Sequence, residues 1–166
     1  MQKLFSPWRS EYIESFQKPK QEGTCIFCDV QSENCDDENS LLVYKGKKVF
    51  ILMNRYPYNN GHLLIIPYRH IASIAEMNEN ERLETFFLLE KSVEALEKTM
   101  FAHGHNIGTN LGKVAGAGID DHIHFHVVPR WNGDTNFMPV LSDVKLVSED
   151  MKKTKQRLYK YFKENL

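Results

Sequence analysis

The chain lacks an excess of charge of one sign, a long apolar run and a dense set of cysteines. Its 21 Lys and Arg nearly cancel its 22 Asp and Glu, so we expect neither a nucleic-acid partner nor a membrane partner. The N-terminal residues MQKLFSPWRSEYIESF carry scattered charges, which predicts no signal peptide and no anchor. Three cysteines are too few for a disulfide framework and fit a reducing compartment, so a cytoplasmic location is expected.

The length and composition predict a single domain. The chain has 166 residues, of which 42% are hydrophobic and 26% charged, and it shows no internal repeat or interdomain linker. We place the core at residues 25–131, with an N-terminal helical extension over 1–22 and a C-terminal helix over 148–165. Within the extension, aromatic residues recur every fourth position from Trp8 to Phe16, which predicts a short helix. Ser148 is the expected cap of the last helix.

The hydrophobic pattern between these ends predicts an α+β domain with a five-stranded antiparallel sheet. LLVYKGKKVFILMN predicts two strands around a turn at Gly46, and HLLIIP, residues 62–67, predicts a central strand. Two more strands are expected over 105–111 and 122–128. A long helix should begin after Asn78, with Glu81 completing a capping box. Its apolar stripe is predicted to be Leu83, Phe86, Phe87, Leu89, Val93, Leu96 and Met100.

Three of the seven histidines alternate with apolar residues in DDHIHFHVVPRW, residues 120–131. On a strand, His122, His124 and His126 would share one face, with neighbours roughly 6.5–7 Å apart. Burying three imidazoles without a function would be costly, so a purely structural role is disfavoured. Two readings remain: the three bind one catalytic zinc, or a neutral imidazole attacks phosphorus while its neighbours assist.

The segment KVAGAGID directly before this row favours the second reading. Gly116 and Gly118 allow the backbone to approach a ligand and to present amide donors to phosphate oxygens. Glycine loops also serve simply to turn corners, but this one leads straight into the histidines.

The CIFC motif offers two thiolate ligands, Cys25 and Cys28, for a tetrahedral metal site. No second CxxC exists to complete it, so His70 and one histidine of the row are the candidates. A structural zinc on His122 would leave His124 and His126 for chemistry. The alternative is a metal-free pair of thiols, and Cys35 has no assigned role.

These motifs resemble the histidine triad family of nucleotide hydrolases and transferases, whose signature is three histidines alternating with apolar residues. MNRYPYNNGHLLIIPYRHI, residues 53–71, is similar to the nucleoside-binding strands of that family, and the likeness covers residues 25–131. PWRSEY and HVVPRWNGDTNFM further resemble the bacterial branch that includes diadenosine tetraphosphate phosphorylases. The resemblance implies the family's fold, an α+β domain with the long helix and the terminal helices described above.

The resemblance also implies roles for the histidines. His124 matches the nucleophile, which would attack an α-phosphate and hold the nucleotide covalently until water or phosphate releases it. His126 would assist charge and proton transfer, and His122 would orient its neighbours. In members that bind zinc, the first histidine of the row is a ligand together with a CxxC pair and the histidine that follows a Pro-x-x motif. These ligands correspond here to His122, Cys25, Cys28 and His70.

The same likeness implies the nucleotide contacts. Asn54 would face the ribose and Asn110 the phosphates. His62, with the apolar residues Phe50, Leu52 and Pro57, would lie around the base pocket, and core packing explains the apolar three equally well. Gly118 stands where many members carry glutamine, so the grip of Gly116 and Gly118 on phosphate would rely on backbone amides. Trp131 would shape the phosphate or second-nucleotide site, with plain packing as the alternative.

The leading functional hypothesis is therefore a nucleotidyl hydrolase or transferase that acts on dinucleoside polyphosphates such as diadenosine tetraphosphate. A nucleoside phosphoramidate hydrolase and a nucleotide-binding regulatory module with little turnover are the alternatives, and a catalytic zinc hydrolase ranks below them. Zinc is the expected structural cofactor, an adenine nucleotide or dinucleoside polyphosphate the expected ligand, and a homodimer or larger homo-oligomer the expected assembly.

Overall fold

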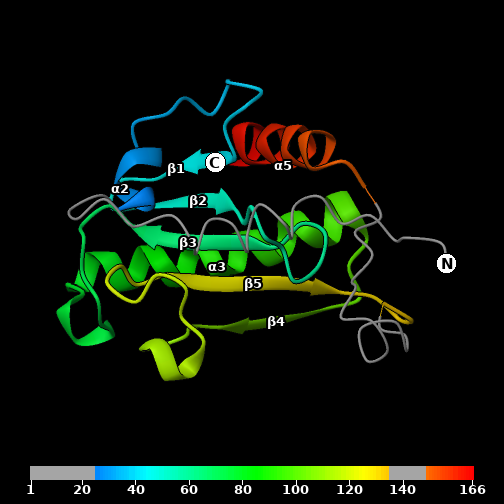
Figure 1. Cartoon of the computed structure of the whole chain (residues 1–166). Coiled ribbons are helices and arrows are strands. Elements are labelled where there is room, and N and C mark those ends of the chain that lie inside the picture. The colour runs from blue at the N-terminus through cyan, green and yellow to red at the C-terminus, as the bar shows by residue number, and fades with distance from the viewer. Residues whose placement is uncertain (1–24, 135–148) are drawn as a thin grey trace, which may run out of the picture.

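The computed structural model describes residues 25–134 and 149–166, and it has the predicted α+β architecture (Figure 1). The predicted helix within residues 1–22 lies outside the described residues. In chain order the elements are α2 (Ile26–Val30), β1 (Leu42–Lys45), β2 (Val49–Met53), β3 (Leu63–Pro67), the 3-10 turn Ile74–Glu76, α3 (Glu79–Met100), β4 (Gly104–Gly108), the 3-10 turn Lys113–Ala115, β5 (Phe125–Arg130) and α5 (Met151–Asn165).

The five strands form one antiparallel sheet in the order β1-β2-β3-β5-β4, as predicted. The β1–β2 hairpin turns at Gly46, whose amide donates to the carbonyl of Val49 at 2.9 Å. β3 is central, and β5 runs between β3 and the edge strand β4. His126 of β5 is paired with Leu64 on one side and Gly108 on the other, so it stands well inside the sheet.

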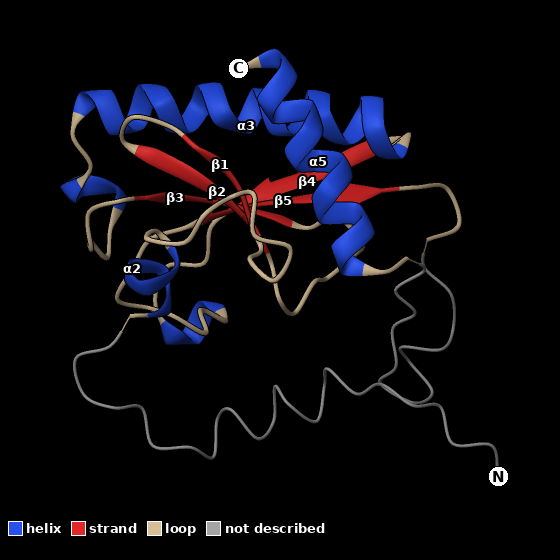
Figure 2. Cartoon of the chain, turned by 90° about the horizontal axis from the view of Figure 1, so that it is seen from above, coloured by secondary structure: helices blue, strands red, loops and turns tan. Residues whose placement is uncertain are grey.

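Alternation along the strands gives the sheet two apolar faces. Val49, Ile51 and Met53 of β2 face the helices α3 and α5. Phe50 and Leu52 of the same strand face the opposite side, where Cys25 and Phe27 of the α2 region pack on them. Figure 2 shows α3 and α5 together on one side of the sheet and α2 on the other. Leu64 lies on the α2 side, so its partner His126 is presented on that side as well.

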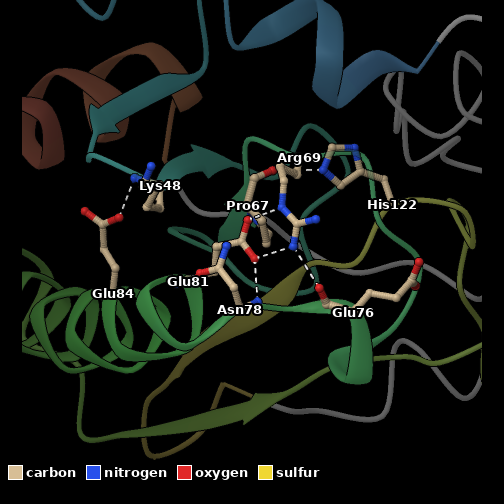
Figure 3. A network of polar contacts seen from close by, with 8 residues as sticks. All are labelled: Lys48, Pro67, Arg69, Glu76, Asn78, Glu81, Glu84 and His122. Atoms are coloured by element: carbon tan, nitrogen blue, oxygen red, sulfur yellow. Dashed lines mark hydrogen bonds and ion pairs between the residues drawn. The ribbon is translucent and has the colours of Figure 1, made fainter.

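Helix α3 begins as predicted, with a capping box between Asn78 and Glu81. Glu81 is buried and also accepts a hydrogen bond at 2.6 Å from Nε of Arg69, which ties the loop after β3 to the helix (Figure 3). The predicted apolar stripe is only partly correct. Leu89, Leu96 and Met100 are buried, whereas Leu83, Phe86 and Phe87 are 64%, 72% and 45% exposed.

The predicted stripe differs from the buried face because two polar residues occupy the buried side of α3. Thr85 and Ser92 point inward with Leu88 and Leu96, and the hydroxyl of Ser92 satisfies itself by donating to the carbonyl of Leu88 at 2.7 Å. An apolar count alone therefore shifts the expected face of the helix.

The last two strands differ from the predicted ranges. β4 covers Gly104–Gly108 rather than 105–111, and β5 begins at Phe125 rather than at His122. The pairing of β5 with β3 starts at Phe125. Nearer the loop, the carbonyl oxygen of Pro67 is hydrogen-bonded to Nε2 of the His122 side chain at 2.9 Å and is not available for a strand hydrogen bond (Figure 3). His122 and His124 therefore lie in the extended segment that leads into the strand.

The C-terminal helix α5 packs on β1 and α3 through the fully buried side chains of Leu158 and Phe162. It begins at Met151, and its cap is Asp150, which accepts from the amides of Lys152 and Lys153. The predicted start at 148 with Ser148 as cap is corrected accordingly. In the two described ranges, no helix has the length and apolar character needed to cross a membrane.

Candidate active site and metal centre

The three histidines of the row do not act as one group. The rings of His124 and His126 are neighbours, with centroids 4.9 Å apart. His122 instead turns Nδ1 toward Cys25 Sγ, at 3.3 Å, and Cys28 Sγ, at 3.7 Å. The structure thus separates a pair of imidazoles from a cysteine–histidine cluster, which disfavours a single metal held by all three histidines.

His124 is oriented by backbone groups. Its Nδ1 lies 2.9 Å from the carbonyl oxygen of His122, and because a carbonyl only accepts, Nδ1 carries the proton. The hydroxyl of Thr109, which follows β4, donates to the carbonyl of His124 at 2.7 Å and fixes the segment from the other side. In neutral His124, the lone pair therefore resides on Nε2, the nitrogen that is left for nucleophilic attack.

His126 is oriented by a fully buried fourth histidine, His62. The backbone amide of Tyr58 and Nδ2 of Asn54 both approach Nδ1 of His62 at 3.1 Å. A backbone amide only donates, so Nδ1 of neutral His62 accepts and its Nε2 carries the proton. That proton is donated to Nδ1 of His126 at 2.9 Å.

The consequence is a defined tautomer for His126. Its Nδ1 is an acceptor, so its proton lies on Nε2, a buried atom with no hydrogen-bond partner among the described residues. A buried donor without a partner is rare in native structures and common at functional sites. The pair thus offers an attacking nitrogen on His124 beside a proton donor on His126.

Desolvation keeps these imidazoles neutral. Burial lowers the pKa of His122 and that of His124 below the usual histidine range. Burial, together with the charge of neighbouring His124, lowers the pKa of His126 to about 4. A neutral imidazole is the form that can act as a nucleophile or as a metal ligand.

Phe27 of α2 packs against two of these histidines. Its ring lies 5.5 Å from that of His122, edge to face, and 5.0 Å from that of His124. Helix α2, which Cys25 precedes and which contains Cys28, thus contacts both the cysteine–histidine cluster and His124.

The cluster consists of the four residues predicted as metal ligands: Cys25, Cys28, His70 and His122. Their ligand atoms all lie within 4.8 Å of one another, and Cys28 Sγ is 3.4 Å from His70 Nδ1. Zinc bonds of about 2.3 Å to sulfur and about 2.0 Å to nitrogen place tetrahedral ligands about 3.5 Å apart. The residues therefore fit a zinc ion. Burial raises the pKa of the Cys28 thiol to about 11, so without a cation it stays protonated at neutral pH.

The predicted nucleotide contacts are less closely grouped. Asn54 lies beside His62, and its amide is engaged at both ends, since Oδ1 accepts from the amide of Tyr56 at 3.0 Å. Asn110 follows Thr109 at the end of β4, partly buried and close in sequence to the contact with His124. Their roles toward ribose and phosphate stay predictions.

The glycine loop is exposed and turns sharply. Gly116 has φ of 89° and its amide donates to the carbonyl of Lys113 at 3.0 Å, so that amide is used inside the turn. Around Gly118 there is open space for an added side chain. Trp131 packs against the helix-side core, and its indole N–H donates to the carbonyl of Met100 at 3.1 Å. The packing alternative for Trp131 thus has support, and a phosphate role for all three residues remains a prediction.

The resemblance placed His62 only around the base pocket, and no role for Tyr58 or Thr109 was expected from the sequence. A histidine directly before an apolar run, as in Gly61-His62, needs a polar partner once that run is buried. The partner, His126, is 64 positions away and is found only through the pairing of β3 with β5.

Comparison with known proteins identifies the fold and the family. Residues 36–133, more than half of the chain, match the family described as "HIT domain". A histidine triad nucleotide-binding protein from Sulfolobus tokodaii aligns with a TM-score of 0.64 and 27% identity over 84% of this chain and 90% of that one. A Zn-bound histidine triad family protein from Mycobacterium smegmatis aligns with a TM-score of 0.67 at 24% identity, over 85% and 94%. The chain therefore belongs to the HIT domain family.

Two curated relatives are enzymes by name. The "AP-4-A phosphorylase" of Mycobacterium tuberculosis is 32% identical over 161 residues, which cover 95% of this chain and 83% of that protein. The asymmetrical bis(5'-nucleosyl)-tetraphosphatase of Schizosaccharomyces pombe is 30% identical over 95 residues, which cover 57% of this chain and 52% of that protein.

We expect the low pKa of His126 to make the protein less stable in mild acid. The folded value of about 4 lies below the unfolded value of about 6.5, so the unfolded state binds more protons between them and the free energy of unfolding falls as the pH drops. Each additional bound proton contributes about 1.4 kcal/mol per pH unit. Urea unfolding at pH 7 and pH 5 measures the effect, and His126→Gln should lose less stability than the wild type. Equal losses in both proteins would contradict the assignment.

Proposed function

We propose that the chain is a nucleotidyl hydrolase or transferase that cleaves dinucleoside polyphosphates at an α-phosphate through a covalent intermediate on His124. The observation that carries the proposal is the opposite orientation of two adjacent imidazoles. His124 has its proton committed to the carbonyl of His122 and keeps Nε2 for attack, whereas His126 has Nε2–H as a donor.

In the first step, Nε2 of His124 forms a bond to the α-phosphorus as the bond from phosphorus to the bridging oxygen breaks. The departing phosphate chain takes the electron pair of that bond, and His126 Nε2–H donates a hydrogen bond to it. The imidazole becomes positively charged, and the carbonyl of His122 stabilises it through Nδ1–H. An oxygen of phosphate or of water then attacks phosphorus, and the bond to His124 breaks with its electron pair returning to Nε2; attacking water releases its proton to the solvent.

The substrate class rests on the relatives. Both named enzymes act, by their names, on diadenosine or dinucleoside tetraphosphates, and one of them is similar to nearly the whole chain. Both reactions fit the same nucleophile, since only the acceptor of the nucleotidyl group differs. The nucleotide would contact Asn54, Asn110, Gly116, Gly118 and Trp131.

Product analysis tests this function. We expect purified protein to split diadenosine tetraphosphate, and chromatography with and without inorganic phosphate identifies the acceptor. ADP plus ATP formed only with phosphate defines a phosphorylase, and AMP plus ATP formed without it defines a hydrolase. His124→Asn keeps a donor for the carbonyl of His122 but has no nucleophile, so turnover should fall at least about 1000-fold. Full activity of this variant would refute the covalent mechanism.

A zinc ion in the cysteine–histidine cluster is proposed as a structural cofactor. Cys25, Cys28, His70 and His122 would supply four ligands, which leaves no open position for water or substrate. When bound, the metal would cross-link α2, the loop after β3 and the segment before His124, without taking part in bond cleavage.

Metal analysis of cysteine variants tests the site. We expect about one zinc per chain in the wild type and its loss in Cys25→Ser, with a lower unfolding temperature. Cys35→Ser is the matched control, because Cys35 packs in the same apolar cluster but is absent from the ligand set. A Cys25→Ser variant that keeps its zinc would favour a metal held by histidines instead.

The edge strand β4 supports the proposal of a homodimer. Among the strands of the described ranges, β4 has a partner on one side only, and Ile107 on it is 51% exposed. An unprotected edge favours pairing with a second sheet. Light scattering should give twice the chain mass of 19.4 kDa, and Ile107→Lys should shift the protein toward monomers. A wild-type protein that is monomeric at all concentrations would rule the dimer out.

A further inference from the structure

A polar bridge links the end of β5 to the loop between β2 and β3. Asp134 accepts hydrogen bonds from Nε and Nη2 of Arg130 at 2.7 and 2.8 Å, and from Nδ2 of Asn59 at 2.7 Å. The Asp134 side chain is only 8% exposed. Hydrogen bonding to Arg130 holds the pKa of Asp134 well below its usual range, so the bridge is charged at neutral pH.

Asn59 is fixed at both its side chain and its backbone. Its Nδ2 also donates to the carbonyl of Pro129 at 3.0 Å, and its own carbonyl accepts from the amide of His62 at 3.1 Å. The residue is buried, so these contacts are not exchanged for water. The end of β5 thus fixes the position of the β2–β3 loop directly before His62.

Tyr58, the residue before Asn59, completes the connection. Its amide is a donor to Nδ1 of His62, and its ring stacks on that of His126, 5.8 Å away at an interplanar angle of 19°. A shift of the loop would remove this donor and leave Nδ2 of Asn54 as the remaining donor to Nδ1 of His62, so the other tautomer of His62 would become accessible. His126 would then lose the proton donor that fixes its own tautomer.

We propose that Asp134 and Asn59 are positioning residues for His126, which hold the loop so that Tyr58 and His62 keep the proton of His126 on Nε2, facing the leaving group. This inference rests on the proposed function and assigns to that reaction two residues outside the histidine row. Asp134 even lies one position beyond the matched HIT domain.

The test uses substitutions that keep the branching and number of side-chain heavy atoms but remove the bridge, Asn59→Leu and Asp134→Leu, in metal-loaded protein. Long-range proton–nitrogen NMR spectra report which ring nitrogen of His62 and of His126 carries the proton. We expect a single tautomer for each in the wild type and a mixture in both variants. With diadenosine tetraphosphate, kcat should fall about tenfold or more, because the positioned donor is lost, while KM changes little. If one variant does not fold, the other carries the test.

Asn60→Leu is the matched control. Asn60 is in the same loop and equally buried, but its side chain bonds to Glu149 and Thr154 of the α5 region instead of β5. Asn60→Leu should lower stability while it leaves both tautomers and kcat as in the wild type. Wild-type tautomers in the bridge variants, or the same mixture in Asn60→Leu, would overturn the proposal. The spectra need no substrate, so a wild-type protein that cleaves nothing refutes the proposed function separately.

Discussion

The hydrogen bond from Nδ1 of His124 to the carbonyl oxygen of His122 is the contact on which both halves of the site depend. It leaves the lone pair of neutral His124 on Nε2, and it is maintained only while the peptide group of His122 keeps its position. The side chain of His122 supplies that restraint through Pro67 on one nitrogen and the two cysteines on the other. The proposed metal site and the proposed nucleophile are thus joined by one short segment, His122 to His124, so the order of the cysteine–histidine cluster constrains the backbone that orients His124.

Backbone groups, which do not titrate, fix the proton positions of His124 and His126. The carbonyl of His122 accepts from His124, and the amide of Tyr58 sets His62, which in turn sets His126. Many histidine sites use a carboxylate for this purpose, and there the orientation depends on the charge of that carboxylate. Here burial on the α2 side of the sheet favours neutral imidazoles. Hydrogen bonds with the backbone then determine which nitrogen of each ring is protonated.

Local patterns were enough to predict much of this molecule. The β1–β2 hairpin, the central strand β3, the start of α3 and the grouping of Cys25 with His70 and one histidine of the row follow from turn residues, alternation and ligand counting. The resemblance to the histidine triad family singled out His122 as that histidine. The start of β5 did not follow from local patterns, because a histidine side chain replaces a strand bond to Pro67. The roles of His62 and Asn59 were also missed, since their partners are 64 and 75 positions away and only the folded sheet brings them together.

Helix α5 lies outside the matched HIT domain, yet Leu158 and Phe162 are fully buried in the same apolar layer as β2 and α3. The matched domain and the unit that folds are therefore not the same length of chain. A fragment cut at the limits of the family match would keep every histidine of the row but would lose Cys25, Phe27 and Cys28, which contact His122 and His124. It would also expose the apolar layer that α5 covers. The limits of the family match are therefore a poor guide to where this chain can be shortened.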